Sequence, residues 1–352
     1  MVDSRTLTIS SGAGIQFWQN WPSNLLNKVL VLNGDGVDPS IINGSGDNIF
    51  VGSINLNGNC VFSVAATALT LSNNVVNGSG GLIKTNAGLL TIYDTLSYTG
   101  NTAINQGTLA LMGSSSLANS PVISLGGGTL NVTGRSDGTL TLPGGQTLTG
   151  NGTVQGLLVA DSGSTLSPGV GVGVLTVTSN VTLQLGSTTF MELNKGSVTN
   201  DQLRATAATP TTINYGGTLS LTNLAGTLAA GDNFKLFSAS NYLGSFSSIT
   251  PATPGPGLVW KTSALNTSGT LSVIVAPVPN INSITTEGGN IVLRGTNGAI
   301  GSLYYVLTST NIGAPLSSWI YVGTNNFDSS GNFSFTNGAP TDPQRFYLIL
   351  VP

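Results

Sequence analysis

Short runs of apolar residues recur along this chain, and most of them are closed by glycine or asparagine. Between residues 81 and 113 the runs are Leu82-Ile83, Leu89-Leu90-Thr91-Ile92, Thr102-Ala103-Ile104 and Leu109-Ala110-Leu111. None is long enough for a helix and none shows helical spacing, so each predicts a short β-strand. Tiny strands at even spacing are typical of a chain that stacks coil upon coil. The pattern therefore predicts an all-β fold built on a parallel β-helix, which we expect to be right-handed.

A Gly-Thr-Leu triplet marks many of the predicted strand starts. It occurs at 107–109, 128–130, 138–140, 217–219, 226–228 and 269–271. Alternation of threonine and leucine places one side chain outward and the next inward, as a half-buried strand requires. The preceding glycine permits the positive φ of a tight corner. With roughly 20–25 residues per coil, we expect about a dozen coils before Val275.

A family resemblance covers the most regular stretch, which reads GGLIKTNAGLLTIYDTLSYTGNTAINQGTLALMG from Gly80. It resembles the autotransporter-associated β-strand repeat, with Asn86 and Ile92 as minor departures. The matching residues are Gly80, Gly81, Leu82, Lys84, Gly88, Leu90, Tyr98, Thr99, Gly100, Thr102, Ile104, Gly107, Thr108 and Leu109. Segments 166–169, 173–177, 201–203, 216–219, 231–237 and 258–260 resemble, in order, the region that follows this repeat in passenger domains. The resemblance implies a solenoid exported from a bacterial cell.

The pattern of apolar runs changes after Ala276-Pro277-Val278-Pro279-Asn280, where two prolines stiffen the chain. Longer and more aromatic runs follow, at 291–293, 304–308, 319–323, 333–336 and 346–351, and they predict a small antiparallel β-sandwich. The segments YYVLTSTN, LSSW, SGNFSFTN and RFYLILVP resemble closing modules of exported, repeat-bearing proteins of Verrucomicrobia-like bacteria. We therefore expect a cap with the first coils at 1–80, regular β-helix at 81–275, a linker at 276–280 and the sandwich at 281–352.

Composition supports a folded, turn-dense β protein. Charged residues make up 7% of the chain and apolar residues 39%, with 48 glycines, and disordered chains lack such apolar content. The net charge of −3 and the absence of a basic patch disfavour nucleic acid as a partner. No segment approaches the ~20 apolar residues of a membrane helix, so we expect no membrane insertion. The first residues carry no signal-peptide pattern, and we expect a signal already removed or a fragment of a longer exported chain.

The sequence contains few candidates for catalytic residues. The chain has no histidine, which removes the commonest general base and metal ligand. Its main acidic candidates are Asp94, Asp137, Asp161, Glu192, Asp201 and Asp232, and they are dispersed. A loop at 33–48 carries Asp35, Asp38 and Asp47 among glycines, but it lacks the spacing of an EF-hand and favours polar turns over a calcium site. We therefore predict a non-enzyme, with no catalytic, cofactor-binding or metal residues and no cofactor.

Two further features have a structural and a functional interpretation. Cys60, the only cysteine, stands beside Val61 and Phe62, which predicts a small buried side chain rather than an intermolecular bridge. Trp18 and Trp21 lie in an aromatic stretch that favours a cap over the open end of the solenoid. The alternative is a surface on which sugar rings stack. Asn-x-Ser/Thr sequences at Asn43, Asn77, Asn131, Asn151, Asn180, Asn266 and Asn332 leave glycosylation open.

The leading functional hypothesis is an extracellular or cell-surface structural protein that assembles end to end into a fibre or sheath. Low charge favours stacking, and the expected partner is a further copy of the chain in an oligomer or polymer. Residues 6–9 and 346–351 are candidate strands for donation to a neighbour. The alternative is an adhesin-like rod that binds carbohydrate, such as a cell-surface or extracellular polysaccharide, or another surface. A degraded polysaccharide-cleaving β-helix enzyme ranks third.

Overall fold

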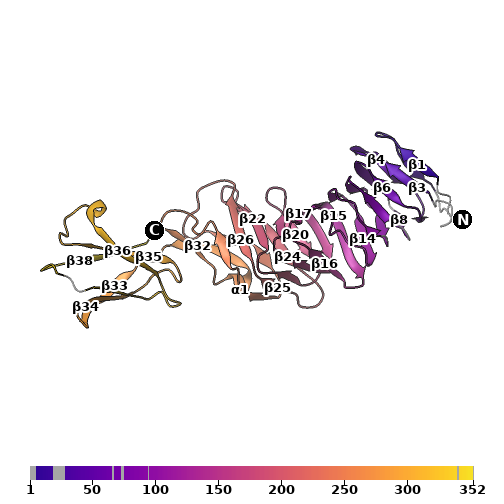
Figure 1. Ribbon diagram of the computed structural model, residues 1–352. Helices are drawn as coiled ribbons and strands as arrows, with labels where there is room; N and C mark the ends of the chain where they lie inside the picture. Colours follow the sequence, from indigo (N-terminus) through magenta and orange to yellow (C-terminus); the bar gives the residue numbers. More distant parts are fainter. Residues whose placement is uncertain are drawn as a thin grey trace. The chain divides into compact units, whose positions relative to one another are not determined.

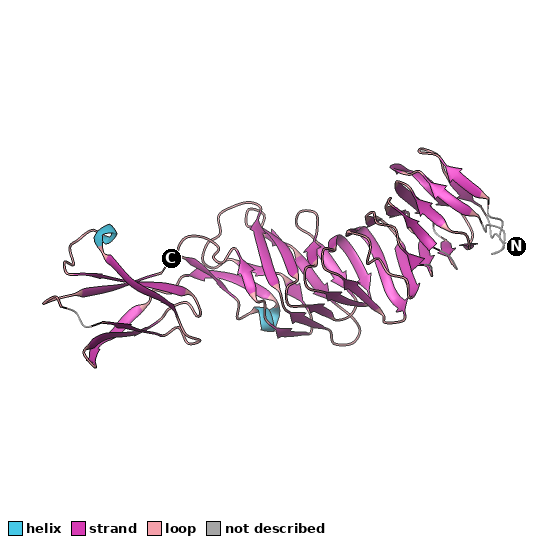
Figure 2. Cartoon of the chain, viewed as in Figure 1, coloured by secondary structure: helices cyan, strands magenta, loops and turns pink. Residues whose placement is uncertain are grey.

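The structure, a computed structural model, describes residues 5–18, 28–65, 67–72, 75–93, 95–338 and 341–351. Nearly all of its regular structure is β-strand (Figures 1 and 2). The chain divides into two compact units. Unit 1 is Met1–Pro254 with Trp260–Val273, and unit 2 is Gly255–Val259 with Ile274–Pro352. Unit 1 is the predicted parallel β-helix, and unit 2 is built from antiparallel sheets.

Three parallel ladders run along unit 1, so each coil has three faces. The first face contains β2 (Ile15–Phe17), β4 (Asp35–Asn43), β7 (Asn59–Val64), β10 (Leu82–Thr85), β13 (Thr102–Ile104), β15 (Val122–Arg135), β17 (Thr147–Gln155), β19 (Thr165–Pro168), β22 (Thr188–Asn194), β26 (Thr218–Asn223) and β30 (Ser248–Thr250). Figure 1 shows these strands stacked one upon the next. The handedness of the coil stays a prediction.

The second and third faces follow the same order. The second contains β5 (Asn48–Phe50), β8 (Ala68–Leu71), β11 (Leu89–Ile92), β14 (Thr108–Gly113), the later parts of β15 and β17, β20 (Val174–Val177), β24 (Gln202–Ala205) and β28 (Phe237–Ser238). The third contains β1 (Thr6–Ile9), β3 (Val29–Leu32), β6 (Ile54–Leu56), β9 (Val75–Gly78) and β12 (Thr95–Leu96), then β16 (Thr139–Leu142), β18 (Leu157–Ala160), β21 (Val181–Leu183), β25 (Thr212–Tyr215) and β29 (Asn241–Gly244). Between β12 and β16 one coil turns without a strand on this face, although Leu117 there is still buried.

The interior is made by the leucines of the alternating pattern. Leu90 pairs with Leu109, Leu109 with Leu130, and Leu130 with Val154, and all four are fully buried. Stacking of like apolar residues along a ladder removes each side chain from water, which stabilises neighbouring coils together. The predicted alternation of inward leucine and outward threonine is therefore confirmed on this face.

Coil length varies more than the expected 20–25 residues. Leu148 pairs with Leu166, which is 18 positions later, whereas Leu219 pairs with Ile249, which is 30 positions later. The longer coils accommodate excursions, such as the antiparallel hairpin of β22 with β23 (Thr199–Asn200). Turn segments can lengthen without disturbing the ladders because the strand register does not depend on the length of the turns.

Two Gly-Thr-Leu glycines show why the corners need glycine. Gly107 has φ of +70°, and a Cβ there would lie 2.4 Å from the carbonyl oxygen of Asn86 in the preceding coil. Gly138 has a similar φ of +60°, but open space surrounds its Cβ position. Both corners require the left-handed region, and only the first also requires close approach of two coils.

The parallel ladders end at β29 and β30, earlier than the expected Val275. β27 (Asn233–Lys235), which precedes β29 in the sequence, pairs antiparallel with β32 (Thr270–Val275). The segment between β30 and β32 contains β31 (Leu258–Lys261) and the short α1 (Leu265–Ser268). Pro251, Pro254 and Pro256 lack the N–H that a further parallel coil would need, which explains the early end. Tyr215, Phe237, Tyr242 and Phe246 form an aromatic cluster at this end, with ring centroids 4.9–5.9 Å apart.

Unit 2 contains the predicted small β-sandwich. One sheet contains β33 (Asn280–Glu287), β34 (Asn290–Thr296) and β37 (Phe333–Asn337); the other contains β36 (Ile320–Asn326), β35 (Leu303–Ser309) and β38 (Phe346–Leu350). A 3₁₀ turn at Leu316–Ser318 precedes β36. Between the sheets lies a core of Leu293, Tyr304, Val306, Phe327 and Phe333. All five aromatic runs predicted as strands overlap strands of this sandwich.

Candidate functional site

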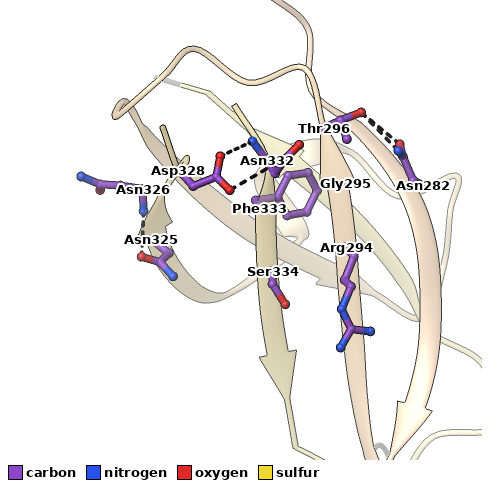
Figure 3. A pocket seen from close by; sticks show the side chains of 10 residues that line it. All are labelled: Asn282, Arg294, Gly295, Thr296, Asn325, Asn326, Asp328, Asn332, Phe333 and Ser334. Carbon is purple, nitrogen blue, oxygen red and sulfur yellow. Dashed lines mark hydrogen bonds between the residues drawn. The ribbon is translucent and has the colours of Figure 1, made fainter. Parts of the chain in front are cut away.

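A groove lies on unit 2, where the first sheet of the sandwich meets the end of β36. Its volume is about 490 Å³, which is within the range of ligand sites. The side chains that line it are drawn in Figure 3 and belong to Asn282, Arg294, Gly295, Thr296, Asn325, Asn326, Asp328, Asn332, Phe333 and Ser334. Most of them are amides, hydroxyls or charged groups, and the groove offers their hydrogen-bonding atoms beside a larger share of apolar surface.

The loop between β36 and β37 forms the middle of the groove, and Asp328 orders it. Oδ1 of Asp328 accepts hydrogen bonds from the backbone N–H of Ser330 and of Asn332, both at 2.8 Å. Oδ2 accepts a bond from Nδ2 of Asn332 at 3.3 Å. The backbone bonds lower the pKa of Asp328, so the carboxylate is ionised at neutral pH. This loop therefore presents a fixed negative charge with an amide beside it.

Hydrogen-bonded asparagine side chains lie on the two sides of this loop, as Figure 3 shows. On one side Nδ2 of Asn282 donates to Oγ1 of Thr296 at 3.2 Å. On the other side Oδ1 of Asn325 accepts the backbone N–H of Asn326 at 2.8 Å. Planar amides held in this way present both a donor and an acceptor in defined directions.

One guanidinium and two carboxylates lie in and around the groove. Nη1 of Arg294 lies 2.5 Å from Oε1 of Glu287, and Nη2 lies 3.1 Å from Oε2. This bidentate pairing lowers the pKa of Glu287 and raises that of Arg294. Because Glu287 balances Arg294, the negative charge of Asp328 remains in the groove. A ligand that is rich in hydroxyl groups and has no negative charge of its own fits such a lining.

Sequence reasoning missed this groove. Four of the eight residues at 325–332 are Asn or Asp, and this local density was the available signal. It gives little contrast in a chain where asparagine is common everywhere. The convergence of Asn282, Thr296 and Asn332 depends on strand register, which places distant segments together.

Of the acidic residues named above, the structure brings Glu192 and Asp201 together. The carboxylate of Asp201 is fully buried and accepts the backbone N–H of Gly173 and of Glu192, both at 2.7 Å. Burial raises the pKa of Asp201 to about 6. Because both oxygens are occupied inside the solenoid, this carboxylate ties β22 to the preceding coil rather than facing a substrate.

The other acids lie in separate places. Asp137 forms an ion pair with Arg135, with Nε and Oδ1 3.0 Å apart, and Asp232 forms one with Lys195. Asp161 is half-buried at a turn, and Asp94 lies outside the described residues. Within the described part of the chain no three His, Cys, Asp or Glu side chains gather in a way that could hold a metal ion.

Residues 35–43 of the predicted 33–48 loop form strand β4, so Asp35 and Asp38 lie in an irregular strand rather than in a loop. Oδ1 of Asp35 accepts the N–H of Val37 and of Asp38, both at 2.9 Å, which is the local bonding of a polar turn. Oδ1 of Asp47 accepts the N–H of Ala68 at 3.0 Å and so joins its own coil to β8 of the next one. Cys60 is fully buried in β7, as its apolar neighbours predict, and burial raises the pKa of its thiol.

The two strands proposed for donation are paired within the chain. β1 pairs in parallel with β3, and β38 pairs antiparallel with β35. Neither is therefore a detached arm ready to enter a neighbour. Trp18 is 58% exposed, and Trp21 lies outside the described residues.

Neither the sequence profiles of known families nor the curated proteins contain a match to the chain. Among the residues that the structure describes, no helix has both the length and the apolar character needed to cross a membrane.

Proposed function

We propose that this chain is an extracellular or cell-surface adhesin-like protein whose β-helix is a scaffold and whose C-terminal sandwich binds neutral carbohydrate. The proposal rests on the groove of Figure 3, where amide and hydroxyl side chains lie beside the carboxylate of Asp328. Sugars present neighbouring hydroxyls that both donate and accept, and planar amide and carboxylate groups complement them. The resemblance to exported repeat proteins supports the location.

The order of the hypotheses thus changes in favour of the adhesin. Assembly through both solenoid ends loses support, because α1 and the aromatic cluster lie at one end and the two candidate donor strands are paired. Asp201 gives no support to a polysaccharide-cleaving role, because its carboxylate is buried inside the solenoid.

Binding to a glycan array, followed by calorimetry with the best ligand, tests the proposal. Asn326→Ala and Ser334→Ala remove exposed groove side chains, and each should weaken binding about tenfold, as loss of one or two hydrogen bonds implies. Gln344→Ala removes an exposed amide of unit 2 outside the groove and should leave the affinity unchanged. Selective binding that all three variants retain would contradict the assignment to this groove. Release of shortened sugars from the bound glycan would instead indicate an enzyme.

A further inference from the structure

A pocket lies at the end of the β-helix, where the parallel ladders stop. Strands β29 and β30 are the last described strands of their ladders, so the interior of the final coil is not covered by a further coil. The space left there has a volume of about 340 Å³, near the lower end of the range of about 300–1,000 Å³ for ligand sites. We call it the terminal pocket, and its lining includes Tyr215, Phe246, Ile249, Ser263 and Asn266. Its lining residues all belong to unit 1, so the terminal pocket is distinct from the groove of unit 2.

Apolar side chains form the floor of the terminal pocket. Ile249 occupies an inward position of β30, since it pairs with the fully buried Leu219, yet Ile249 itself is only half-buried. The floor also contains Phe246, which packs on Tyr215 with ring centroids 4.9 Å apart and ring planes inclined by 32°. Phe246 is half-buried, so part of its ring is open to the pocket. An aromatic ring exposed in this way can pack against the apolar C–H face of a sugar ring.

Hydroxyl and amide groups form the rim of the pocket. Ser245, Thr262 and Ser263 are exposed, and their hydroxyls have no hydrogen-bond partner among the described residues. Nδ2 of Asn266 donates to the carbonyl oxygen of Gly244 at 2.9 Å, which leaves Oδ1 of the same amide as an acceptor. No lining residue is charged, so the terminal pocket offers apolar packing and hydrogen bonds to a neutral ligand.

We propose that the terminal pocket binds one neutral pyranose ring of a saccharide. A pyranose has an apolar face of C–H groups and hydroxyls around its edge, which matches an apolar floor with a rim of hydroxyls and an amide. A charged ligand would lose hydration without gaining an opposite charge. A purely apolar ligand would make no use of the rim. The β-helix, a scaffold in the function proposed above, thus carries a binding site of its own.

Two hydrogen bonds fix the segment that forms one wall of the pocket. Oη of Tyr215 donates to the carbonyl oxygen of Leu265 at 3.2 Å, and the Asn266 amide is bonded to Gly244. Helix α1, which begins at Leu265, packs against β28 and β29. A wall held in this way lowers the ordering cost of binding. For a single ring of about twelve non-hydrogen atoms we expect a dissociation constant on the order of 1 mM.

Saturation-transfer NMR of the full chain tests the proposal, with the methyl pyranosides of glucose, mannose and galactose as probes. Every chain compared carries Asn326→Ala and Ser334→Ala, so that the groove of unit 2 contributes little. At least one pyranoside should receive saturation, whereas sorbitol, which has the hydroxyls but no ring, should not. Ser263→Trp fills the pocket and should weaken binding at least tenfold. Thr267→Trp is the matched control, since Thr267 is also an exposed hydroxyl residue, on α1 but outside the pocket lining.

A second variant tests the floor. Phe246→Leu keeps an apolar side chain but removes the ring, and it should weaken binding about threefold to tenfold. Thermal unfolding of each variant verifies that it is folded. Because Phe246→Leu and Ser263→Trp change different parts of the pocket, either one tests the proposal if the other does not fold.

The proposal would be overturned if none of the three pyranosides binds, or if sorbitol binds equally well. Binding that Ser263→Trp and Phe246→Leu both retain, or that Thr267→Trp loses equally, would also overturn it, because the site would then lie elsewhere. Benzyl alcohol that binds where no pyranoside does would show that the pocket takes an apolar ring instead. Glycan binding that is lost only with Asn326→Ala or Ser334→Ala would still support the groove of unit 2, so the two proposals can fail separately.

Discussion

Replacing Lys84 by methionine tests how adjacent coils are joined at a corner. Lys84 points into the solenoid, where its position on β10 is flanked by Phe62 of β7 and Ile104 of β13 in the same ladder. The side chain is fully buried. Its Nζ donates to the carbonyl oxygens of Thr85 at 2.8 Å, Asn86 at 2.6 Å and Gln106 at 3.3 Å. The ammonium thus joins the turn of its own coil to the turn of the next.

Two opposing effects decide the size of the change. Each hydrogen bond from a charged donor contributes about 1.5–3 kcal/mol. Against this, burial lowers the pKa of Lys84 to about 8 from 10.5, a shift that costs the charged form about 3 kcal/mol. Methionine fills similar space, removes the buried charge and leaves three carbonyls with fewer partners. We expect Lys84→Met to lower the free energy of unfolding by about 2 kcal/mol at pH 7.

The pH dependence separates the charge from the packing. Below pH 8 the lysine is protonated in both the folded and the unfolded chain, so the cost of burying the charge is fully present. Between pH 8 and 10.5 the unfolded chain holds the proton and the folded chain does not. Wild-type stability therefore gains up to about 1.4 kcal/mol per pH unit from this group, and the variant lacks this gain.

Urea unfolding of both proteins at pH 7, 8, 9 and 10 provides the measurement. Burial raises the pKa values of Cys60 and Tyr98, which lowers stability at alkaline pH, but this contribution is common to both proteins and cancels in their difference. The difference should widen from pH 8 to 10. Lys261→Met, at an exposed lysine, should match the wild type throughout. Equal stability of Lys84→Met and wild type, with parallel pH profiles, would refute the reasoning.

Three further predictions concern the solenoid. The free energy of unfolding of Asp201→Asn should fall relative to that of the wild type as the pH falls from 6 to 4. The pKa of Asp201 is about 6 in the folded chain against an ordinary value of 3.8, so the folded wild type takes up the proton first and is stabilised. Urea titrations at pH 4, 5 and 6 measure this difference, and a difference that stays constant would contradict the prediction. Gly107→Ala should cost about 3–4 kcal/mol and Gly138→Ala about 1 kcal/mol, because both require positive φ but only the first meets a backbone oxygen. Equal losses for the two would show that coil contact is unimportant at residue 107. The thiol of Cys60 should react with an aromatic disulfide reagent only after unfolding in urea, and rapid reaction of the folded chain would contradict its burial.

The repeating pattern predicted the solenoid because each coil is specified locally. Leu90 and Leu109 are placed by the alternation within their own strands, and glycine at residue 107 meets a local steric demand. The same reasoning located the strands of the sandwich, since aromatic and β-branched runs favour strands. It overestimated how far the β-helix extends, because it weighed Gly-Thr-Leu at 269–271 above the three prolines near residue 254.

What could not be predicted depends on register between distant segments. Lys84 is recognisable as an inward position, but its partner Gln106 belongs to the next coil. The groove requires Asn282 and Asn332 to lie close together, and no local sequence pattern specifies that proximity.

Because the three ladders of the β-helix carry hydrogen bonds only between adjacent coils, the number of coils can change without altering any one of them. Duplication or loss of a segment of about one coil, by recombination within the gene, would leave matching strand edges on either side. Each added coil would lengthen the solenoid by about 4.8 Å. Related chains could then differ in the length of the solenoid while keeping the same groove.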